Sequence, residues 1–255
     1  MSDANNISEI NGKKVFFLYP TASVQNQIIT ELAQHEYEVY VIKNHVQIIR
    51  VLEKYPDSIL FVNIDEKMHK KEWEKWFSDK LSAMTEVKIG IFTSDTSDEL
   101  HDRFTKYKVP CGFTPLKVDM SGYINKIIDT LNSLNVKGRR KYLRASTKDE
   151  STAKLNMPFG GGIISGVIND VSVVGISCVF ENDPNLAKNE LVKNIQVRLQ
   201  SMLLKVEAVV FGSRVVENEK IYVMLFTQRI DSEVKAKIRK YIQHNLQSKI
   251  DTELK

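Results

Sequence analysis

The sequence predicts two domains, an α/β domain of the flavodoxin-like, doubly wound type and an antiparallel β-barrel that ends in a helix. Strand-like and helix-like runs alternate over the first 135 residues, whereas residues 136–255 contain successive strand-like runs separated by short turns. The first rhythm is typical of a parallel sheet covered by helices on both faces. The second is typical of an antiparallel sheet or small barrel. With 255 residues, 42% of them hydrophobic, the chain is long enough for two cores.

The first domain is expected over residues 12–135, as five strands that are each followed by a helix. Each predicted strand is a short apolar run, and each predicted helix has apolar residues at intervals of three or four. The strands are expected at residues 15–18, 37–42, 59–64, 87–93 and 109–113. The helices are expected around residues 24–32, 46–52, 73–84, 100–107 and 123–134.

This alternation resembles the receiver domain of response regulators, but the receiver chemistry is not in the sequence. A receiver has an acidic pair after its first strand, where this chain has Leu18-Tyr19-Pro20-Thr21. It has a phosphate-accepting aspartate at the end of its third strand, where the nearest candidates are Asn63 and Asp65, neither in register. Thr93 fits the hydroxyl position, but Thr114-Pro115 replaces the lysine-proline pair. Without the acidic pair a metal ion lacks its oxygen ligands, so we predict a degenerate receiver without phosphorylation chemistry.

The second domain is expected over residues 136–255. Its strands are predicted at residues 163–168, 173–180, 191–199, 202–216 and 221–226. Three glycines at 160–162 lack the ending of a phosphate-binding P-loop and are expected to form a hairpin turn or a bulge. Asp231-Ser232 supplies a helix N-cap, after which apolar residues recur every four positions from Val234 to Leu246, so we expect a C-terminal helix packed on the barrel.

Charge is distributed unevenly between the two halves. Residues 1–135 contain 16 Lys/Arg and 19 Asp/Glu, a net −3, whereas residues 136–255 contain 20 and 13, a net +7. The second half is therefore expected to attract an anionic partner. The two cysteines lie 67 positions apart, without metal-site spacing, and no apolar run is long enough to span a bilayer, so we expect a cytoplasmic protein without a bound metal.

Two short motifs in the second half carry the functional prediction. Arg139-Arg140-Lys141-Tyr142-Leu143-Arg144 contains Arg-x-x-x-Arg, and Asp170-Val171-Ser172-Val173-Val174-Gly175 begins 26 residues after Arg144. This pair, in this order, resembles the PilZ domain, the bacterial receptor module for cyclic di-GMP. The resemblance covers about residue 138 to the C-terminal helix. It implies that Arg140, Arg144, Asp170, Ser172 and Gly175 contact the ligand.

The chemistry of the arginines suits a cyclic dinucleotide. A guanidinium group can pair bidentately with phosphate or with the O6/N7 edge of guanine, and it can stack on a base. Arg140 and Arg144 are therefore expected to hold the ligand from a flexible arm. Arg139 directly precedes the motif, and we expect its additional guanidinium to let the site hold two stacked ligands.

The second motif is expected to form the rigid wall of the site. Asp170 can accept hydrogen bonds from the N1 and N2 protons of guanine, and Ser172 can donate to a phosphate. Gly175 would let the backbone turn or a base approach closely. Singly, Asp170 and Gly175 are also residues that cap or form ordinary turns.

The sequence thus predicts a cyclic di-GMP-binding effector without a cofactor or catalytic residues. Ligand would clamp the arginine-rich arm onto the barrel and reorient the two domains. The receiver-like domain would then signal to a downstream protein. The alternative is a nucleic-acid-binding protein that uses the basic second half. An enzyme built on the first half is disfavoured because that half has neither a glycine-rich first turn nor an acidic pair.

Overall fold

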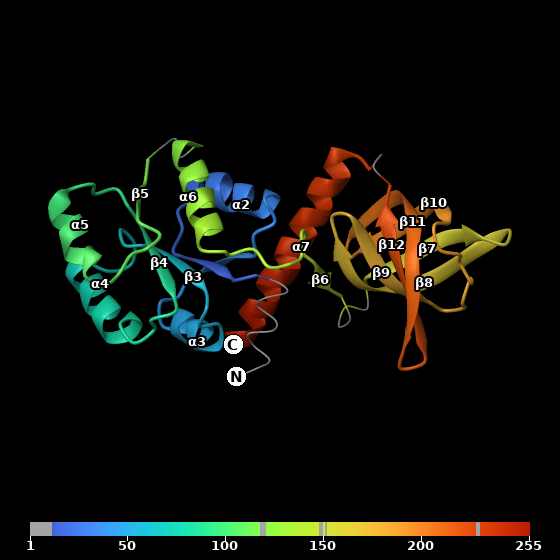
Figure 1. The fold of residues 1–255 in the computed structure, drawn as a ribbon, viewed down its shortest axis with the longest axis horizontal. Helices are drawn as coiled ribbons and strands as arrows, with labels where there is room; N and C mark the ends of the chain where they lie inside the picture. Colours follow the sequence, from blue (N-terminus) through green and yellow to red (C-terminus); the bar gives the residue numbers. More distant parts are fainter. Residues whose placement is uncertain (1–11, 118–120, 148–149, 151, 228–229) are drawn as a thin grey trace. The chain divides into compact units, whose positions relative to one another are not determined.

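The computed structural model describes residues 12–117, 121–147, 150, 152–227 and 230–255, which form two compact units (Figure 1). Unit 1 consists of residues 12–141 and Gln247–Lys255, and unit 2 of Tyr142–Leu246. The sequence predicts this division at 135/136 and the whole C-terminal helix within the second domain. Unit 1 extends past 135 because Val136 is buried in its core and accepts a hydrogen bond from the backbone N–H of Lys13 at 2.8 Å.

Unit 1 contains a five-stranded, all-parallel sheet with the strand order β2-β1-β3-β4-β5. The strands are β1 Val15–Leu18, β2 Val39–Ile42, β3 Ile59–Asn63, β4 Lys88–Thr93 and β5 Phe113–Pro115. This order is that of the flavodoxin-like doubly wound fold and confirms the predicted fold class. β1 and β3 are buried along their whole length, as expected for the central strands of a sheet that helices cover on both faces.

The helices of unit 1 lie where the apolar periodicity predicted them. They are η1 Val24–Ile29, which is π-helical, α2 Thr30–Gln34, α3 Gln47–Lys54, α4 Lys70–Trp76, η2 Phe77–Leu81, which is also π-helical, α5 Asp98–Thr105 and α6 Ser121–Ser133. The strand predicted at 109–113 is wrong for its first four residues. There the N–H of Gly112 bonds the carbonyl of Val109 in a turn, and Gly112 takes φ +70°, so the strand begins only at Phe113.

The end of the C-terminal helix α7, Ser232–Glu253, is part of unit 1. The side-chain amide of Gln247 accepts from the backbone N–H of Val41 at 2.8 Å and donates to its carbonyl at 3.0 Å. Ile250 is buried, and Glu253 forms an ion pair of 2.8 Å with Lys54. Gln247 thereby satisfies backbone groups on β2, an edge strand of the sheet.

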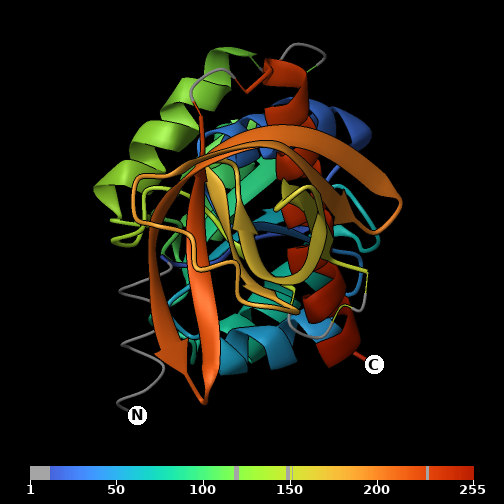
Figure 2. The same cartoon turned by 90° about the vertical axis from the view of Figure 1, so that its right-hand side faces the viewer.

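Unit 2 is a closed six-stranded antiparallel barrel with one short additional strand (Figure 2). Its strands are β6 Ala145–Ser146, β7 Lys154–Phe159, β8 Gly162–Ser172, β9 Gly175–Phe180, β10 Leu191–Leu199, β11 Met202–Val216 and β12 Glu219–Phe226. The ring runs β8-β7-β10-β11-β12-β9 and closes through β8–β9 pairing, with β6 beside β8. This confirms the predicted barrel.

The barrel core is made of the alternate, inward-facing residues of these strands, and the first part of α7 packs against it through Ile238, Tyr241 and Ile242. Gly160 and Gly161 have φ of +58° and +81° between β7 and β8, as a tight hairpin turn requires. Within the described parts of the chain, no helix has both the length and the apolar character needed to cross a membrane.

Candidate ligand-binding site

The short strand β6 positions Arg144. β6 pairs with β8 so that Ser146 lies opposite Asp170, and the buried Thr147 extends this pairing through its N–H to the carbonyl of Asn169 at 2.9 Å. Arg144 directly precedes β6 and so lies beside the strand that carries Asp170. The distance from Arg144 Nη1 to Asp170 Oδ1 is 3.4 Å. The structure therefore brings together one predicted arginine and the predicted carboxylate.

The hairpin of β8 and β9 supplies a second partner for Asp170. Its loop has two residues, Val173 and Val174, so Ser172 lies opposite Gly175 and Asp170 lies opposite Ser177. The hydroxyl of Ser177 donates to Asp170 Oδ2. Ser177 is not among the residues predicted for the site, although antiparallel register counted outward from a two-residue loop identifies it.

The Arg144–Asp170 pair is held weakly. The two side chains are 45% and 32% exposed, and their single contact is at the long end of hydrogen-bond distances. Surface ion pairs of this kind contribute about 0–1 kcal/mol. An incoming phosphate can therefore replace Asp170 as the partner of the guanidinium at little cost, which also frees Asp170 Oδ1 to accept from a ligand N–H.

Ser172 is placed differently from what its predicted role requires. Its side chain is buried, and its hydroxyl donates to the carbonyl of Gly175 at 3.2 Å and accepts from the N–H of Val174 at 3.4 Å. In this structure the hydroxyl closes the β8–β9 loop and does not face solvent. A hydrogen bond from the Ser172 hydroxyl to a ligand phosphate stays a prediction.

Gly175 has a clear packing role. A Cβ atom built at this position would lie 2.3 Å from the carbonyl oxygen of Met224 and 3.1 Å from Cα of Leu225. The φ of Gly175 is not in the left-handed region, so the turn that we predicted here is not what requires glycine. The group that approaches Gly175 is the backbone of β12, and the approach of a ligand base to this residue stays a prediction.

The remaining two predicted arginines, Arg139 and Arg140, are exposed and belong to the end of unit 1. Of the three predicted arginines, only Arg144 therefore belongs to the same unit as Asp170. The roles of Arg139 and Arg140 as ligand-binding residues stay predictions.

In unit 1, Asp65 is surrounded by hydrogen-bond donors at the carboxyl end of the sheet. Its Oδ1 accepts from Thr93 Oγ1 at 2.8 Å and from the ammonium group of Lys70. Its Oδ2 accepts from the N–H of Ser94 at 2.5 Å and from Ser94 Oγ at 2.6 Å. Burial alone would raise the pKa of Asp65, but the bonds from Lys70, Ser94 and Thr93 outweigh it and lower the pKa to about 2.

Asn63, at the end of β3, is buried and donates to the carbonyl of Tyr19 at 3.0 Å. The last residue of β3 thus carries an amide and not a carboxylate. Among the residues that the structure describes, no group of three or more His, Cys, Asp or Glu could hold a metal ion.

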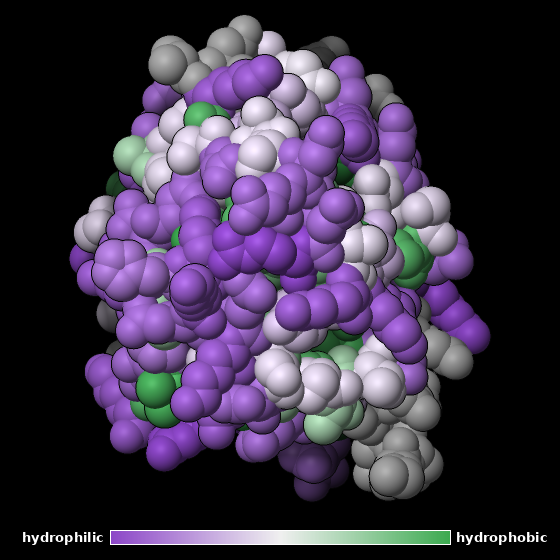
Figure 3. Space-filling model, turned by 90° about the vertical axis from the view of Figure 1, so that its left-hand side faces the viewer, coloured by the Kyte–Doolittle hydropathy of each residue, from purple (hydrophilic) through white to green (hydrophobic). Residues whose placement is uncertain are grey.

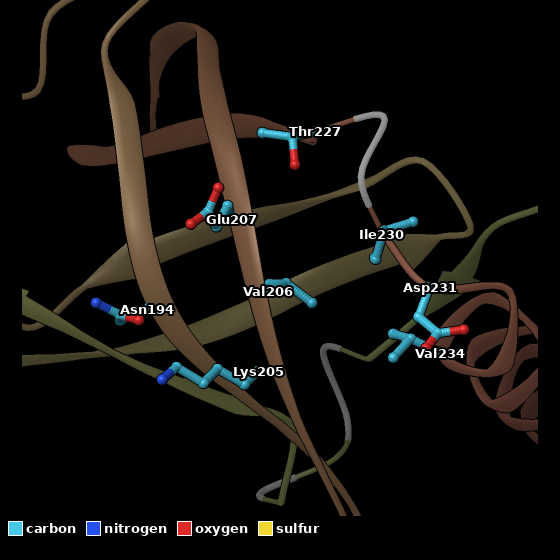
Figure 4. Close-up of a pocket in the computed structure, with 8 residues that line it drawn as sticks. All are labelled: Asn194, Lys205, Val206, Glu207, Thr227, Ile230, Asp231 and Val234. Carbon is cyan, nitrogen blue, oxygen red and sulfur yellow. The ribbon is translucent and has the colours of Figure 1, made fainter.

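Two hollows of about 370 and 400 Å³ lie on the surface of unit 2. The first, shown in Figure 4, lies where β10 and β11 approach the start of α7, and it is lined by Asn194, Lys205, Val206, Glu207, Thr227, Ile230, Asp231 and Val234. The second is lined by Lys154, Leu155, Asn156, Gln196, Arg198, Ser201 and Leu203. Neither of these two hollows is lined by Arg144 or Asp170.

No protein-family model matches the sequence, and no curated protein is detectably similar to it. Among solved structures, the PilZ domain of Escherichia coli YcgR with c-di-GMP is similar, with 15% identity and a TM-score of 0.39, over 45% of this chain and 96% of that one. The K. pneumonia MrkH–c-di-GMP complex has 19% identity and a TM-score of 0.36, over 41% of this chain and about half of that one (51%).

A third similar structure is the Vibrio cholerae chemotaxis response regulator CheY4, with 14% identity and a TM-score of 0.39, over 49% of this chain and 99% of that one. The similar structures are thus of the two kinds that the sequence resemblances named, PilZ proteins and receiver domains. These likenesses concern the fold.

Proposed function

We propose that this protein is a receptor for cyclic di-GMP and not an enzyme. The proposal depends on one observation: Arg144 and Asp170 are solvent-accessible and only weakly paired with each other. The pairing of β6 with β8 places them side by side, at the end of an arginine-rich segment. The pair offers one cation for a phosphate and one anion for the N–H edge of a guanine. Cyclic di-GMP carries both groups.

In the proposed complex, a ligand phosphate takes the guanidinium of Arg144 from Asp170. Charge-assisted bonds of this kind are roughly twice as strong as neutral ones. The freed Oδ1 of Asp170 accepts from guanine N1–H and the N2 amino group, while Ser177 continues to orient the carboxylate through Oδ2. Arg140 binds a second phosphate or a guanine edge, and Arg139 stacks on an exposed guanine, which permits two ligands in the site.

The proposed signal depends on the chain between the two motifs. Residues 139–144 include the division between the units at 141/142. Ligand that fastens this segment to the barrel would reorient one unit with respect to the other, and unit 1 would then act on a downstream protein. The face of unit 1 seen in Figure 3 is mainly hydrophilic, with small, scattered hydrophobic areas. A partner on that face would be recognised chiefly by charge and hydrogen bonds.

Isothermal titration of the full chain with cyclic di-GMP tests the proposal. We expect saturable binding that Arg144→Ala and Asp170→Asn each weaken by about 10- to 150-fold, because a hydrogen bond to a charged group contributes about 1.5–3 kcal/mol. Arg198→Ala is the matched control, since it removes an exposed arginine of the same barrel outside the site. The proposal fails if the chain does not bind cyclic di-GMP, or if Arg144→Ala and Asp170→Asn both bind it as the unchanged chain does.

The variant Arg139→Ala tests how many cyclic di-GMP molecules the site holds, separately from how tightly it binds them. If Arg139 holds a second stacked ligand, this variant should bind one ligand where the unchanged chain binds two. Unchanged stoichiometry and affinity would remove Arg139 from the site and leave the receptor proposal intact.

A further inference from the structure

The outer face of β7, β10 and β11 carries a cluster of cations that the cyclic di-GMP site does not use. Strand register places Lys154 opposite Arg198 and Asn156 opposite Gln196. On the other side of β10, Gln196 lies opposite Lys205. The side chains of all five are exposed, while Leu155, Val197 and Leu204 between them are buried. Three cations and two amides therefore project from three neighbouring strands. We call Lys154, Arg198 and Lys205 the cation ladder.

The ladder is not neutralised within the described part of the chain. No carboxylate of those residues lies within 4.0 Å of the ladder cations, and the neighbouring 400 Å³ hollow has no acidic residue in its lining. Lys154 and Arg198 are directly opposite across β7 and β10, where like charges destabilise a sheet. An anion bound from outside the chain would relieve this repulsion.

The other hollow of unit 2 provides an internal contrast. Its lining includes Glu207 and Asp231, so it combines acidic residues with the ladder residue Lys205. In Figure 4 the amino group of Lys205 points away from Asp231, toward the side on which Asn194 is drawn. The acidic residues of this hollow thus lie beyond Lys205, whereas the lining of the 400 Å³ hollow contains cations, neutral polar residues and two leucines but no acid.

We infer that the cation ladder binds the phosphate backbone of double-stranded DNA without regard to sequence. Directly opposite positions on paired strands lie about 5 Å apart and diagonal ones about 7–8 Å, so the ladder presents three charges to several phosphates of one polyanion. Arg198 can bind a phosphate bidentately, and Asn156 and Gln196 can donate to phosphate oxygens.

The composition of the surface selects the duplex backbone over other polyanions. Single-stranded nucleic acid is usually held by aromatic side chains on which the bases stack, and neither the ladder nor the lining of the 400 Å³ hollow contains an aromatic residue. An acidic peptide would be expected to use apolar anchors beside the charges. Leu203, which is 67% exposed, is the one exposed apolar residue in that lining.

Fluorescence anisotropy of the full chain with a labelled 20-base-pair DNA duplex tests the inference. Two duplexes of unrelated sequence should bind equally, with a slope of log K against log salt of about −2.7 for three phosphate contacts. Lys154→Gln and Arg198→Gln should each reduce the magnitude of the slope by about 1 and weaken binding by roughly eightfold at 0.1 M salt. Arg198→Lys keeps the charge and should keep the slope.

Lys237→Gln is the matched control, because it removes the same charge from unit 2 at a lysine that is paired with Glu233 at 2.6 Å on α7. Cyclic di-GMP affinity should be unchanged in the ladder variants, so loss of DNA binding and loss of the receptor function are distinguishable. The inference is overturned if the duplex does not bind or if Lys237→Gln has the same effect as Arg198→Gln. It is also overturned if a polyglutamate peptide or the single strand binds more tightly than the duplex.

Discussion

Replacement of Asp65 by asparagine tests whether the donors around this carboxylate stabilise unit 1. The pKa of Asp65 falls from 3.8 to about 2, and each pKa unit corresponds to 1.36 kcal/mol. The ionised carboxylate thus contributes about 2 kcal/mol to folding before solvent screening. Because the side chain is partly exposed, at 22%, we expect Asp65→Asn to lower the free energy of unfolding by about 1–2 kcal/mol at pH 7.

The sign of the pH dependence follows from the direction of the shift. A carboxylate whose pKa is depressed by folding stabilises the protein above its unfolded pKa, and this stabilisation is lost as pH falls through the folded value. The difference in the free energy of unfolding between the unchanged chain and Asp65→Asn should therefore be largest at pH 7. It should shrink between about pH 4 and pH 2. Protonation of the aspartate makes the two side chains nearly equivalent at the acid end.

Tryptophan fluorescence in urea measures this effect in the full chain. The sequence has two tryptophans, Trp73 and Trp76, and both are buried in unit 1, so their emission follows the unfolding of that unit. Asp57→Asn is the control, since Asp57 forms a more exposed ion pair with Lys13 at 3.0 Å and should cost at most about 1 kcal/mol. The reasoning is refuted if Asp65→Asn and Asp57→Asn are indistinguishable at pH 7, or if the Asp65 difference persists unchanged at pH 2.

Three further predictions concern single contacts. Ser177→Ala should weaken cyclic di-GMP binding in calorimetry, since Asp170 loses the hydroxyl that orients it, whereas Ser165→Ala, on an exposed bond to Asn156, should not. Gly175→Ala should lower the thermal midpoint of unit 2 through a cost of about 1–3 kcal/mol, because its Cβ meets the backbone of β12; an unchanged midpoint would contradict the packing role. Gln247→Ala should lower the urea midpoint of tryptophan emission, at a cost of about 1–3 kcal/mol, because two backbone groups of Val41 lose their partner; hydrogen exchange at the Val41 amide should rise with it.

The pattern of apolar residues was sufficient to predict both sheets. Central parallel strands such as Ile59–Asn63 are continuous apolar runs, and they were found for that reason. The strand β7 was not predicted, although Leu155 and Met157 alternate with polar residues, because Pro158 and the glycines after it read as a turn. β6 is two residues long and has no period to detect.

Contacts between distant elements could not be predicted in this way. Apolar residues at every fourth position of α7 identify the buried face of this helix, but they do not show which unit buries each turn. The hydrogen bonds between Gln247 and Val41 join residues that are 206 positions apart. The donors of Asp65 come from Lys70 on α4 and from Thr93 and Ser94 at the end of β4. The strand order brings these groups together, and a single sequence contains no direct signal for it.

The second motif divides into residues that build the hairpin and one that presents charge. The hydroxyl of Ser172 closes the two-residue loop, and Gly175 lets β9 approach β12, so together they set the register in which Asp170 faces Ser177. Asp170 alone among the three remains partly exposed beside Arg144. If this division is correct, Ser172→Ala should reduce the stability of unit 2 more than it reduces intrinsic affinity for cyclic di-GMP, whereas Asp170→Asn should do the reverse. The two variants therefore separate the framework of the site from its chemistry.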